Sequence, residues 1–166
     1  EGACVQAYEN GVIIYSPKTG AWEQYGDIRN KFVAAGSVDG SLGFPVSGIA
    51  SSSYGNYQEF ENGIIIANSN GIIFSYGSIY EKYLEKKDKL GQLVADINTN
   101  IGIYGASVQA FESGVIISSP KTGTWEQYGA IRQKFIEIGS VNSVLGLPFG
   151  PINCSIGFEG ACVQAY

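Results

Sequence analysis

The chain repeats itself along its length. Residues 11–26 read GVIIYSPKTGAWEQYG, and residues 114–129 repeat this segment with two differences. A diverged and shorter version, GIIIANSNGIIFSYG, occupies residues 63–77 between them. A sequence that is similar to itself at a fixed interval builds its fold from copies of one small unit, so this feature constrains the fold before any other.

Four kinds of anchor residue recur in the same order around each copy. A glutamine opens each unit, at spacings of 52, 51 and 55 residues, and an acid, a small polar residue and a glycine follow it. A Gly-x-Ile step and then a Leu-Gly step complete the unit. We therefore predict repeat 1 at residues 1–57, repeat 2 (degenerate) at 58–108 and repeat 3 at 109–163, with 164–166 beginning the next. The opening glutamines are Gln6, Gln58, Gln109 and Gln164, and the segments from acid to glycine are 9–11, 61–63 and 112–114. The Gly-x-Ile steps begin at Gly26, Gly77 and Gly129, and the Leu-Gly steps occupy 42–45, 90–93 and 145–148.

A longer period is superimposed on the short one. The octapeptide EGACVQAY occupies residues 1–8 and again residues 159–166, which are 158 positions apart. Three repeats therefore make one block, and the chain contains one block and the first eight residues of another. This predicts a parent protein with many blocks in series. The alternative is a chain designed with overlapping ends.

Each repeat begins with a pattern typical of short strands. Asn10-Gly11 is a favoured two-residue hairpin signal, whose two central residues need positive φ. Val12 to Tyr15 is β-branched and aromatic, as in a strand, and Pro17 to Gly20 reverses the chain into a third strand. Each repeat is therefore predicted to begin with a three-stranded antiparallel meander.

After the meander, apolar residues recur at a helical interval. Ile28, Phe32 and Ala35 share one face of a predicted short amphipathic helix, and Ile131, Phe135 and Ile138 repeat the pattern. Asp27 is expected to cap the first helix and Gly36 to end it. The helix of repeat 2 contains Lys86 and Lys87, and three residues are missing before Leu90. We therefore expect this helix to be the most solvated of the three.

One meander and one helix of about 50 residues bury too little apolar surface to be stable alone. Stacking on neighbouring repeats supplies the missing burial. The predicted fold is an α+β tandem repeat in which the apolar residues after each helix attach it to its own or the next sheet. These residues are Leu42, Phe44, Leu145 and Leu147, with Pro45 and Pro148 fixing the chain exit.

The overall charge limits the classes of partner. The formal net charge is −5 and the sequence pI is about 4.7, so nucleic-acid phosphates and anionic lipid surfaces would be repelled. The basic run Lys82–Lys89 contains Glu85 and Asp88 and is interpreted as a solvated helix face. No segment is long and apolar enough for a membrane span. Since the chain has no Met and no signal peptide, we expect a mature product or an excerpt.

The three cysteines are explained by the longer period. Cys4 and Cys162 are the same position of the block, so each block has two cysteines. Cys154 and Cys162 are eight residues apart, with Gly157 and Gly160 between them, and we predict a disulfide across a hairpin. Cys4 then pairs outside the fragment or stays free. A disulfide indicates an extracytoplasmic compartment; the alternative is three buried free thiols.

No part of the chain has the composition of an active site. His is absent, and no Cys-x-x-Cys spacing occurs, so imidazole-based catalysis and a zinc site are not expected. Paired carboxylates could serve a glycosidase. However, Glu9, Glu61 and Glu112 recur in every repeat, which favours a structural role. We predict a non-enzyme without cofactor or metal.

A binding site is a better prediction than catalysis. The strands WEQY at 22–25 and 125–128 place an aromatic ring beside amide and carboxylate groups, a combination suited to sugar rings and hydroxyls. Because strand residues alternate between faces, only two of the four can share a face. The alternative is that both tryptophans are core residues. The candidate glycan-binding residues are Trp22, Gln24, Tyr25, Trp125, Gln127 and Tyr128.

The motif Leu42-Gly43-Phe44-Pro45, with Leu145-Gly146-Leu147-Pro148 and the upstream Ser-Pro-x-Thr-Gly, Trp and Gly-x-Ile pattern, resembles the LGFP repeat family. The resemblance covers nearly the whole chain, although repeat 2 has Leu-Gly-Gln-Leu. It implies a secreted or cell-surface bacterial protein. Such repeats often accompany mycoloyl transferases or peptidoglycan hydrolases and tie them to cell-wall glycan. The resemblance also implies propeller-like rings of small β units; an open superhelical array is the alternative.

Two functions follow from these observations. The first is a non-catalytic extracellular repeat array that binds cell-wall or extracellular polysaccharide. The second, motivated by the 158-residue period, is the structural part of a filament or adhesin stalk in which blocks contact their neighbours. Neither function involves nucleic acid or a membrane span.

Overall fold

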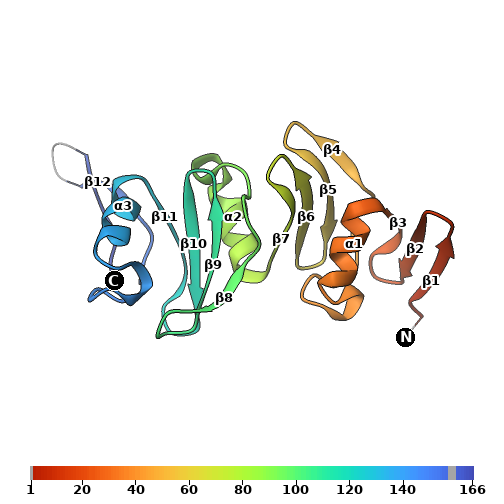
Figure 1. Ribbon diagram of the computed structural model, residues 1–166, viewed down its shortest axis with the longest axis horizontal. Coiled ribbons are helices and arrows are strands. Elements are labelled where there is room, and N and C mark those ends of the chain that lie inside the picture. Colours follow the sequence, from red (N-terminus) through yellow and green to blue (C-terminus); the bar gives the residue numbers. More distant parts are fainter. Residues whose placement is uncertain (1, 157–159) are drawn as a thin grey trace. The chain divides into compact units, whose positions relative to one another are not determined.

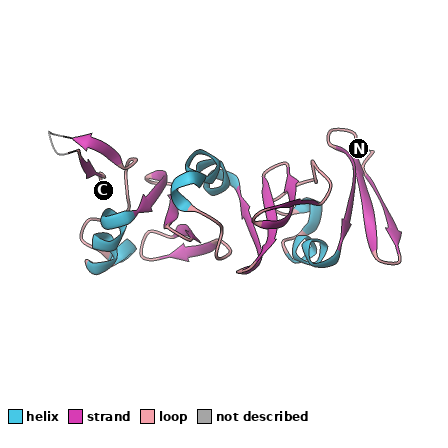
Figure 2. Cartoon of the chain, turned by 90° about the horizontal axis from the view of Figure 1, so that it is seen from above, coloured by secondary structure: helices cyan, strands magenta, loops and turns pink. Residues whose placement is uncertain are grey.

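The computed structural model describes residues 2–156 and 160–166, which alternate between antiparallel strands and helices (Figures 1 and 2). It divides into two compact units, Glu1–Tyr80 and Glu81–Tyr166, which are described separately. The strands of the first unit are β1 Cys4–Tyr8, β2 Gly11–Ser16, β3 Gly20–Tyr25, β4 Ala50–Ser52, β5 Gly55–Phe60, β6 Gly63–Asn68 and β7 Gly71–Tyr76. Those of the second are β8 Asn98–Ile101, β9 Ala106–Phe111, β10 Gly114–Ser119, β11 Gly123–Tyr128, β12 Asn153–Ile156 and β13 Ala161–Val163. The helices are α1 Gly26–Ala34, α2 Gly77–Leu90 and α3 Gly129–Glu137, with short 3-10 helices η1 Ser37–Asp39 and η2 Ser140–Asn142.

The first unit contains two antiparallel sheets. Strands β1-β2-β3 form the predicted meander, and β4-β5-β6-β7 form a second meander with an additional strand, β4, at its edge. The sequence prediction missed β4 and its counterparts β8 and β12, because these strands are short and mostly polar. The predicted repeat boundaries at 57/58 and 108/109 fall inside β5 and β9.

The first hairpin differs from the prediction in the role of its glycine. Tyr8 pairs with Gly11, so the two loop residues are Glu9 and Asn10. None of Glu9, Asn10 and Gly11 has positive φ. Gly11 is the first residue of β2. The Asn-Gly interpretation as a turn with two left-handed residues is therefore wrong. In repeats 2 and 3 the matching glycine lies directly beneath a leucine of the preceding repeat, as described below.

Helix α1 packs between the two sheets of its unit (Figure 1). Its apolar residues, Ile28 and Phe32, are buried as predicted. On one side they pack against Val12 and Ile14 of β2, and on the other against Phe60 and Ile65 of the next sheet. A sheet, its helix and the next sheet therefore share one core.

The ends of the helices show why repeat 2 is shorter. Gly36 follows α1 with φ of 97°, which confirms its predicted role in ending the helix. Tyr25, rather than Asp27, occupies the N-cap, so the predicted Asp27 cap is wrong; Asp27 lies in the first turn. Repeats 1 and 3 insert η1 and η2 before their Leu-Gly steps. In repeat 2, α2 continues for 14 residues to the buried Leu90.

The second unit repeats this arrangement. Strands β11-β10-β9-β8 form a four-stranded sheet, and β12 pairs with β13. Phe135 of α3 packs against Val115 and Ile117 of β10 in a core that also includes Leu147. Repeat 3 therefore has the same meander, helix and Leu-Gly order as repeat 1.

The four residues predicted to attach the helices have different surroundings. Leu42 and Leu147 are buried, and Phe44 packs against the core around α1. Leu145, in contrast, is 46% exposed. Leu145 does not pack against a sheet within the described residues of this chain, whereas the leucines at the same position of repeats 1 and 2, Leu42 and Leu90, each lie over the glycine of the following hairpin.

The fold class is α+β, with antiparallel sheets and helices in sequence. Neither unit, within its described residues, contains a closed barrel or propeller, so the propeller-like ring implied by the resemblance is not found. Among the described residues, no helix combines the length and apolarity needed to cross a bilayer.

Candidate functional site at the contacts between repeats

The three candidate glycan-binding residues of each WEQY strand do not share one face of their sheet. In β3, Trp22 and Gln24 project from one face and Tyr25 from the other, as the strand alternation predicts. Gln24 is 1% exposed, and Gln127, the matching residue of β11, is fully buried. These two amides therefore have no surface that a glycan could reach, which is a correction to their predicted role.

Gln24 instead contacts the next repeat. Its Nε2 donates to Oε1 of Gln58, the glutamine that opens repeat 2, at 3.1 Å. Gln58 in turn donates through Nε2 to the backbone carbonyl oxygens of Glu23, at 3.0 Å, and Ser47, at 2.8 Å. The side chain of Gln58 thus joins the last strand of one meander to the Leu-Gly segment of the same repeat.

The same arrangement recurs after repeat 3. Gln127 donates to Oε1 of Gln164 at 3.3 Å and to the hydroxyl of Tyr166 at 2.9 Å. Gln164 donates to the carbonyl oxygens of Glu126, at 2.9 Å, and Gly150, at 2.8 Å. Burial raises the pKa of Tyr166, while its bond to Gln127 acts in the opposite direction.

Gln109, which opens repeat 3, is also fully buried, and its Nε2 donates to the carbonyl oxygen of Ala95 at 3.0 Å. The opening glutamines Gln58, Gln109 and Gln164 are therefore all structural elements of a contact with the preceding repeat.

A pair of stacked aromatic rings accompanies each of these glutamines. The ring centroids are 4.8 Å apart for Phe32 and Phe60, and 4.9 Å apart for Tyr83 and Phe111. The third pair is Phe135 and Tyr166, at 5.1 Å. In each pair a helix residue of one repeat packs on the residue that lies two positions after the opening glutamine of the next. Offset stacking adds to the apolar area that these contacts bury.

The recurrent acid contacts the Leu-Gly segment of the preceding repeat. The backbone N–H of Phe44 donates to Oε2 of Glu61 at 3.0 Å, and Lys18 Nζ donates to Oε1 at 2.7 Å. The hydrogen bond from Lys18, followed by that from Phe44, lowers the pKa of Glu61 below its ordinary value. In the second unit, the N–H of Gln92 donates to Oε2 of Glu112 at 2.9 Å.

Two glycines, Gly43 and Gly91, allow the carboxylates of these acids to approach the backbone of the Leu-Gly segment. Gly43 and Gly91 have φ of 73° and 74°, a conformation that disfavours any side chain. A Cβ atom at Gly43 would lie 2.8 Å from Oε2 of Glu61, and one at Gly91 would lie 2.5 Å from Oε2 of Glu112. The central glycine of the Leu-Gly step is therefore required by both the backbone and the bound carboxylate.

The glycine that follows the acid is covered by the leucine of the preceding repeat. A Cβ atom at Gly63 would lie 2.8 Å from Cδ2 of Leu42, and one at Gly114 would lie 2.6 Å from Cδ2 of Leu90. The repeated Glu-x-Gly and Leu-Gly motifs therefore fit together across the contact.

The remaining predicted residues keep some accessible surface. The indole N–H of Trp22 donates to the carbonyl oxygen of Thr19 at 2.6 Å, which holds the ring over its own turn, and Trp125 makes the same bond to Thr122. Both tryptophans and Tyr128 are half-buried, whereas Tyr25 is exposed.

The basic run on α2 is less solvated than predicted. Lys86 Nζ lies 3.1 Å from Oε1 of the fully buried Glu126, and Lys82 lies over the Trp125 ring at 5.4 Å from its centroid. Because an unpaired buried carboxylate is costly, Lys86 is required by Glu126. These two lysines therefore contact the sheet of repeat 3, and the solvated-face interpretation is wrong for them.

The outer face of the first sheet differs from the matching faces of the later sheets. Tyr8 is 54% exposed and Ile13 is 37% exposed. Their counterparts Phe60 and Ile65 are 4% and 0% exposed, because α1 covers them. Phe111 and Ile116 of the third sheet are similarly buried. The first sheet thus exposes the surface that a preceding helix covers elsewhere.

The predicted disulfide is present. It joins Cys154 of β12 to Cys162 of β13, and Cys4 on β1 is exposed and forms no disulfide in this chain. Gly160 lies in the connecting hairpin with φ of 66°, while Gly157 lies outside the described residues. Within residues 2–156 and 160–166, no group of three or more His, Cys, Asp or Glu side chains could hold a metal ion.

Sequence reasoning predicted a structural role for the recurrent acids but not their contact with the Leu-Gly segment, and it missed the role of the glutamines, although a signal was present. The glutamine and acid recur in repeat 2, whereas Trp22 is replaced there by Ile73. Residues shared by all three repeats serve the contact that all repeats need. The arrangement provides packing and hydrogen bonds between repeats.

Comparison with known proteins agrees with this organisation. The family model for the LGFP repeat matches residues 1–40 and 90–143, more than half of the chain. No curated protein matches the sequence. The family is associated with cell surfaces and is not enzymatic. This chain belongs to the LGFP repeat family.

Proposed function

We propose that this chain is a non-catalytic structural array of a cell-surface protein, in which LGFP repeats bind one another in series. The observation that carries the proposal is the change in exposure at matching positions. Tyr8 and Ile13 are exposed, whereas Phe60 and Ile65 are buried under the helix of the preceding repeat. The first sheet therefore has an apolar surface suited to the helix of another repeat.

The contact uses different surfaces on its two partners. One repeat contributes its helix and Leu-Gly segment, and the next contributes the opening glutamine, the aromatic residue and the acid. A contact between two different surfaces can be repeated without limit, unless the rotation from one repeat to the next closes the array into a ring. Such an array suits a spacer that holds other parts of a protein away from the surface.

Chains of one, two and three 158-residue blocks, expressed as single polypeptides, test this proposal. If the blocks bind in series, the maximum dimension measured by small-angle X-ray scattering rises by a constant increment per block. Stability to urea also rises from one block to two, because each added contact buries apolar surface. Compact particles whose radius follows the cube root of mass contradict the proposal.

Attachment to glycan is a second candidate function. It is supported by the accessible ring of Tyr25 and the half-buried rings of Trp22, Trp125 and Tyr128, since aromatic faces pack well against sugar rings. Gln24 and Gln127 take no part, because they are buried. In this function the array would bind cell-wall or extracellular polysaccharide directly.

Co-sedimentation with insoluble cell-wall polysaccharide tests the second function. Replacing Tyr25 by Ser should reduce the bound fraction severalfold if this ring contacts sugar. Tyr54→Ser is the matched control, since Tyr54 is 57% exposed, against 51% for Tyr25, and lies outside the candidate strands. No sedimentation of the unmodified chain, or equal losses in the two variants, contradicts glycan binding at this site.

A further inference from the structure

The Leu-Gly segments of repeats 1 and 2 bind an acidic turn through the same three hydrogen bonds. In the first unit, Glu61 N–H donates to the Phe44 carbonyl oxygen at 2.9 Å, and Asn62 N–H donates to that of Leu42 at 3.0 Å. Phe44 N–H donates back to the Glu61 carboxylate at 3.0 Å. The second unit repeats this set with Glu112, Ser113, Leu90 and Gln92, at 3.0, 2.8 and 2.9 Å.

The Leu-Gly segment of repeat 3 has the same backbone conformation as the two segments that bind an acidic turn. Phe149 N–H donates to the Ala165 carbonyl oxygen at 2.8 Å, as Val46 does to Glu59 at 3.0 Å. Gly146 has φ of 75°, the conformation found at Gly43 and Gly91. The segment is therefore preorganised in the same way up to Tyr166, the residue that matches Phe60.

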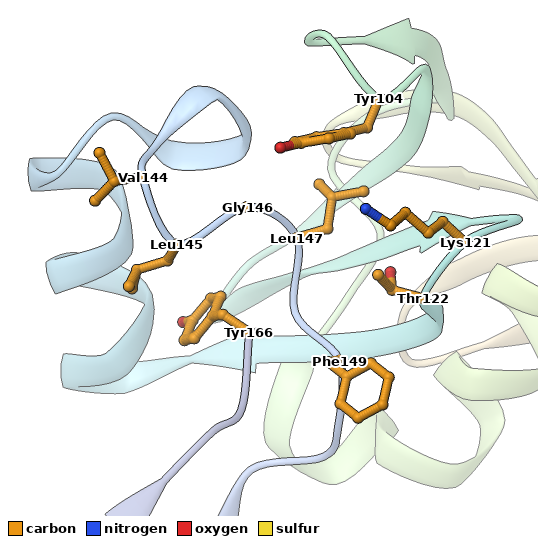
Figure 3. Close-up of a pocket in the computed structure, with 9 residues that line it drawn as sticks. All are labelled: Tyr104, Lys121, Thr122, Val144, Leu145, Gly146, Leu147, Phe149 and Tyr166. Carbon is orange, nitrogen blue, oxygen red and sulfur yellow. The ribbon is translucent and has the colours of Figure 1, made fainter.

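A pocket of about 280 Å³ lies where the turn binds in the other repeats. Tyr104, Lys121, Gly146, Leu147 and Tyr166 are among its lining residues, and Figure 3 shows Lys121 reaching toward Leu147 beside the Tyr104 ring. Lys121 Nζ lies 5.3 Å from the centroid of that ring. A Cβ atom at Gly146 would meet only Tyr104, at 3.9 Å, so the space that Glu61 and Glu112 fill elsewhere is open here.

We propose that this pocket binds the acidic turn Glu9-Asn10-Gly11 of a second copy of the block. The two copies are joined in series, so that residues 159–166 of the first copy serve as residues 1–8 of the second. The sequence supports this occupant, because Tyr8 precedes Glu9 as Phe60 precedes Glu61. Lys121 occupies the position of Lys18, whose ammonium group binds Glu61. The exposed Leu145 would cover Gly11, as Leu42 covers Gly63.

This inference rests on the proposed array and names one contact between its blocks. The test compares residues 1–166, called the single block because they hold one block and only eight residues of the next, with a two-block chain in which residues 9–166 follow Tyr166 directly. The readout is hydrogen exchange of the Leu147 amide, measured by NMR. We expect exchange to slow about tenfold or more when the second block is present, since a carboxylate that accepts this N–H makes a charge-assisted bond.

Two substitutions identify the groups. Glu9→Gln in the second block should remove most of the tenfold protection. Lys121→Ala should reduce the protection in the two-block chain, whereas Lys134→Ala, which removes a lysine outside the pocket, is the control and should leave the protection unchanged. Lys121 is exposed, so its replacement leaves the fold intact, and amide spectra of the single-block variant check this.

Equal Leu147 exchange rates in the one-block and two-block chains overturn the proposal, as does full protection in the Glu9→Gln variant. The scattering test of the array is independent of this result, so blocks that bind in series by another surface would be recognised. If soluble cell-wall polysaccharide fragments shift the Lys121 and Tyr104 signals of the single block, the pocket takes glycan, and the proposal is likewise overturned.

Discussion

Gln24 donates through Nε2 to Oε1 of Gln58 at 3.1 Å, and both side chains are almost completely buried. Each amide has a donor and an acceptor, so the pair binds two repeats without placing a charge in the core. Because Gln58 Nε2 donates to two backbone carbonyl oxygens at fixed positions, the pair also favours one relative placement of the two meanders.

Replacing Gln58 by Ala should lower the free energy of unfolding by about 2–3 kcal/mol, because Gln24 and two backbone carbonyl groups lose a buried partner. Urea denaturation followed by far-UV circular dichroism measures this loss. Gln6→Ala is the matched control, since Gln6 has the same position in repeat 1 and is exposed. Equal losses in the two variants would show that the buried pair has no special role.

Leu42→Ala should destabilise the chain by about 2–5 kcal/mol, the range for truncating a buried leucine. Leu42 is fully buried over Gly63, whereas Leu145, at the same position of repeat 3, is 46% exposed. Leu145→Ala should therefore cost less than about 1 kcal/mol. Thermal unfolding of both variants checks the difference, and a large loss at Leu145 would contradict the assigned exposure.

The contact between repeats 1 and 2 should weaken in acid. Lys18 and the Phe44 N–H stabilise the carboxylate of Glu61 and lower its pKa below the ordinary value of 4.5. The unfolded chain binds this proton more readily, so the contribution to stability is complete above pH 4.5 and is lost as the pH falls through the lowered pKa. Denaturation midpoints between pH 7 and pH 3 should show this decline.

Glu61→Gln should flatten that decline, and Lys18→Ala should move it to higher pH. Lys134→Ala serves as the control, because Lys134 and Glu137 form an exposed ion pair within helix α3. If Glu61→Gln leaves the pH dependence unchanged, other carboxylates are responsible for the acid sensitivity.

Reduction of the Cys154–Cys162 disulfide should loosen the hairpin of β12 and β13. Closure of a loop with a sequence separation of eight is worth about 2.5 kcal/mol in the chain-entropy model. Replacing both cysteines by Ser should therefore speed hydrogen exchange in residues 153–156 and 161–163, with little change in β2 or β6. Cys4→Ser is the control and should have no effect on that exchange.

The sequence predicted the parts of a repeat better than the contacts between them. The meander, the helix that follows Gly26, the glycine after that helix and the disulfide all follow from short-range patterns, in which alternation and helical spacing are properties of neighbouring residues. The strands β4, β8 and β12 were missed, because short polar edge strands have no such pattern. Asp27 was misassigned because the boundary of a short helix depends on the strand before it.

The Leu-Gly-Phe-Pro motif indicated the family, and recurrence and local pattern were sufficient to determine the α+β class and the order of meander and helix within a repeat. Only the tertiary structure decided which recurrent residues face a neighbouring repeat. Gln24 and Gln127 belong to polar strands and could face solvent in an isolated meander, but the glutamines of the following repeat bury them. The same physical reason explains why Leu42 is buried and Leu145 is exposed, since burial of the leucine depends on its contact with a following hairpin.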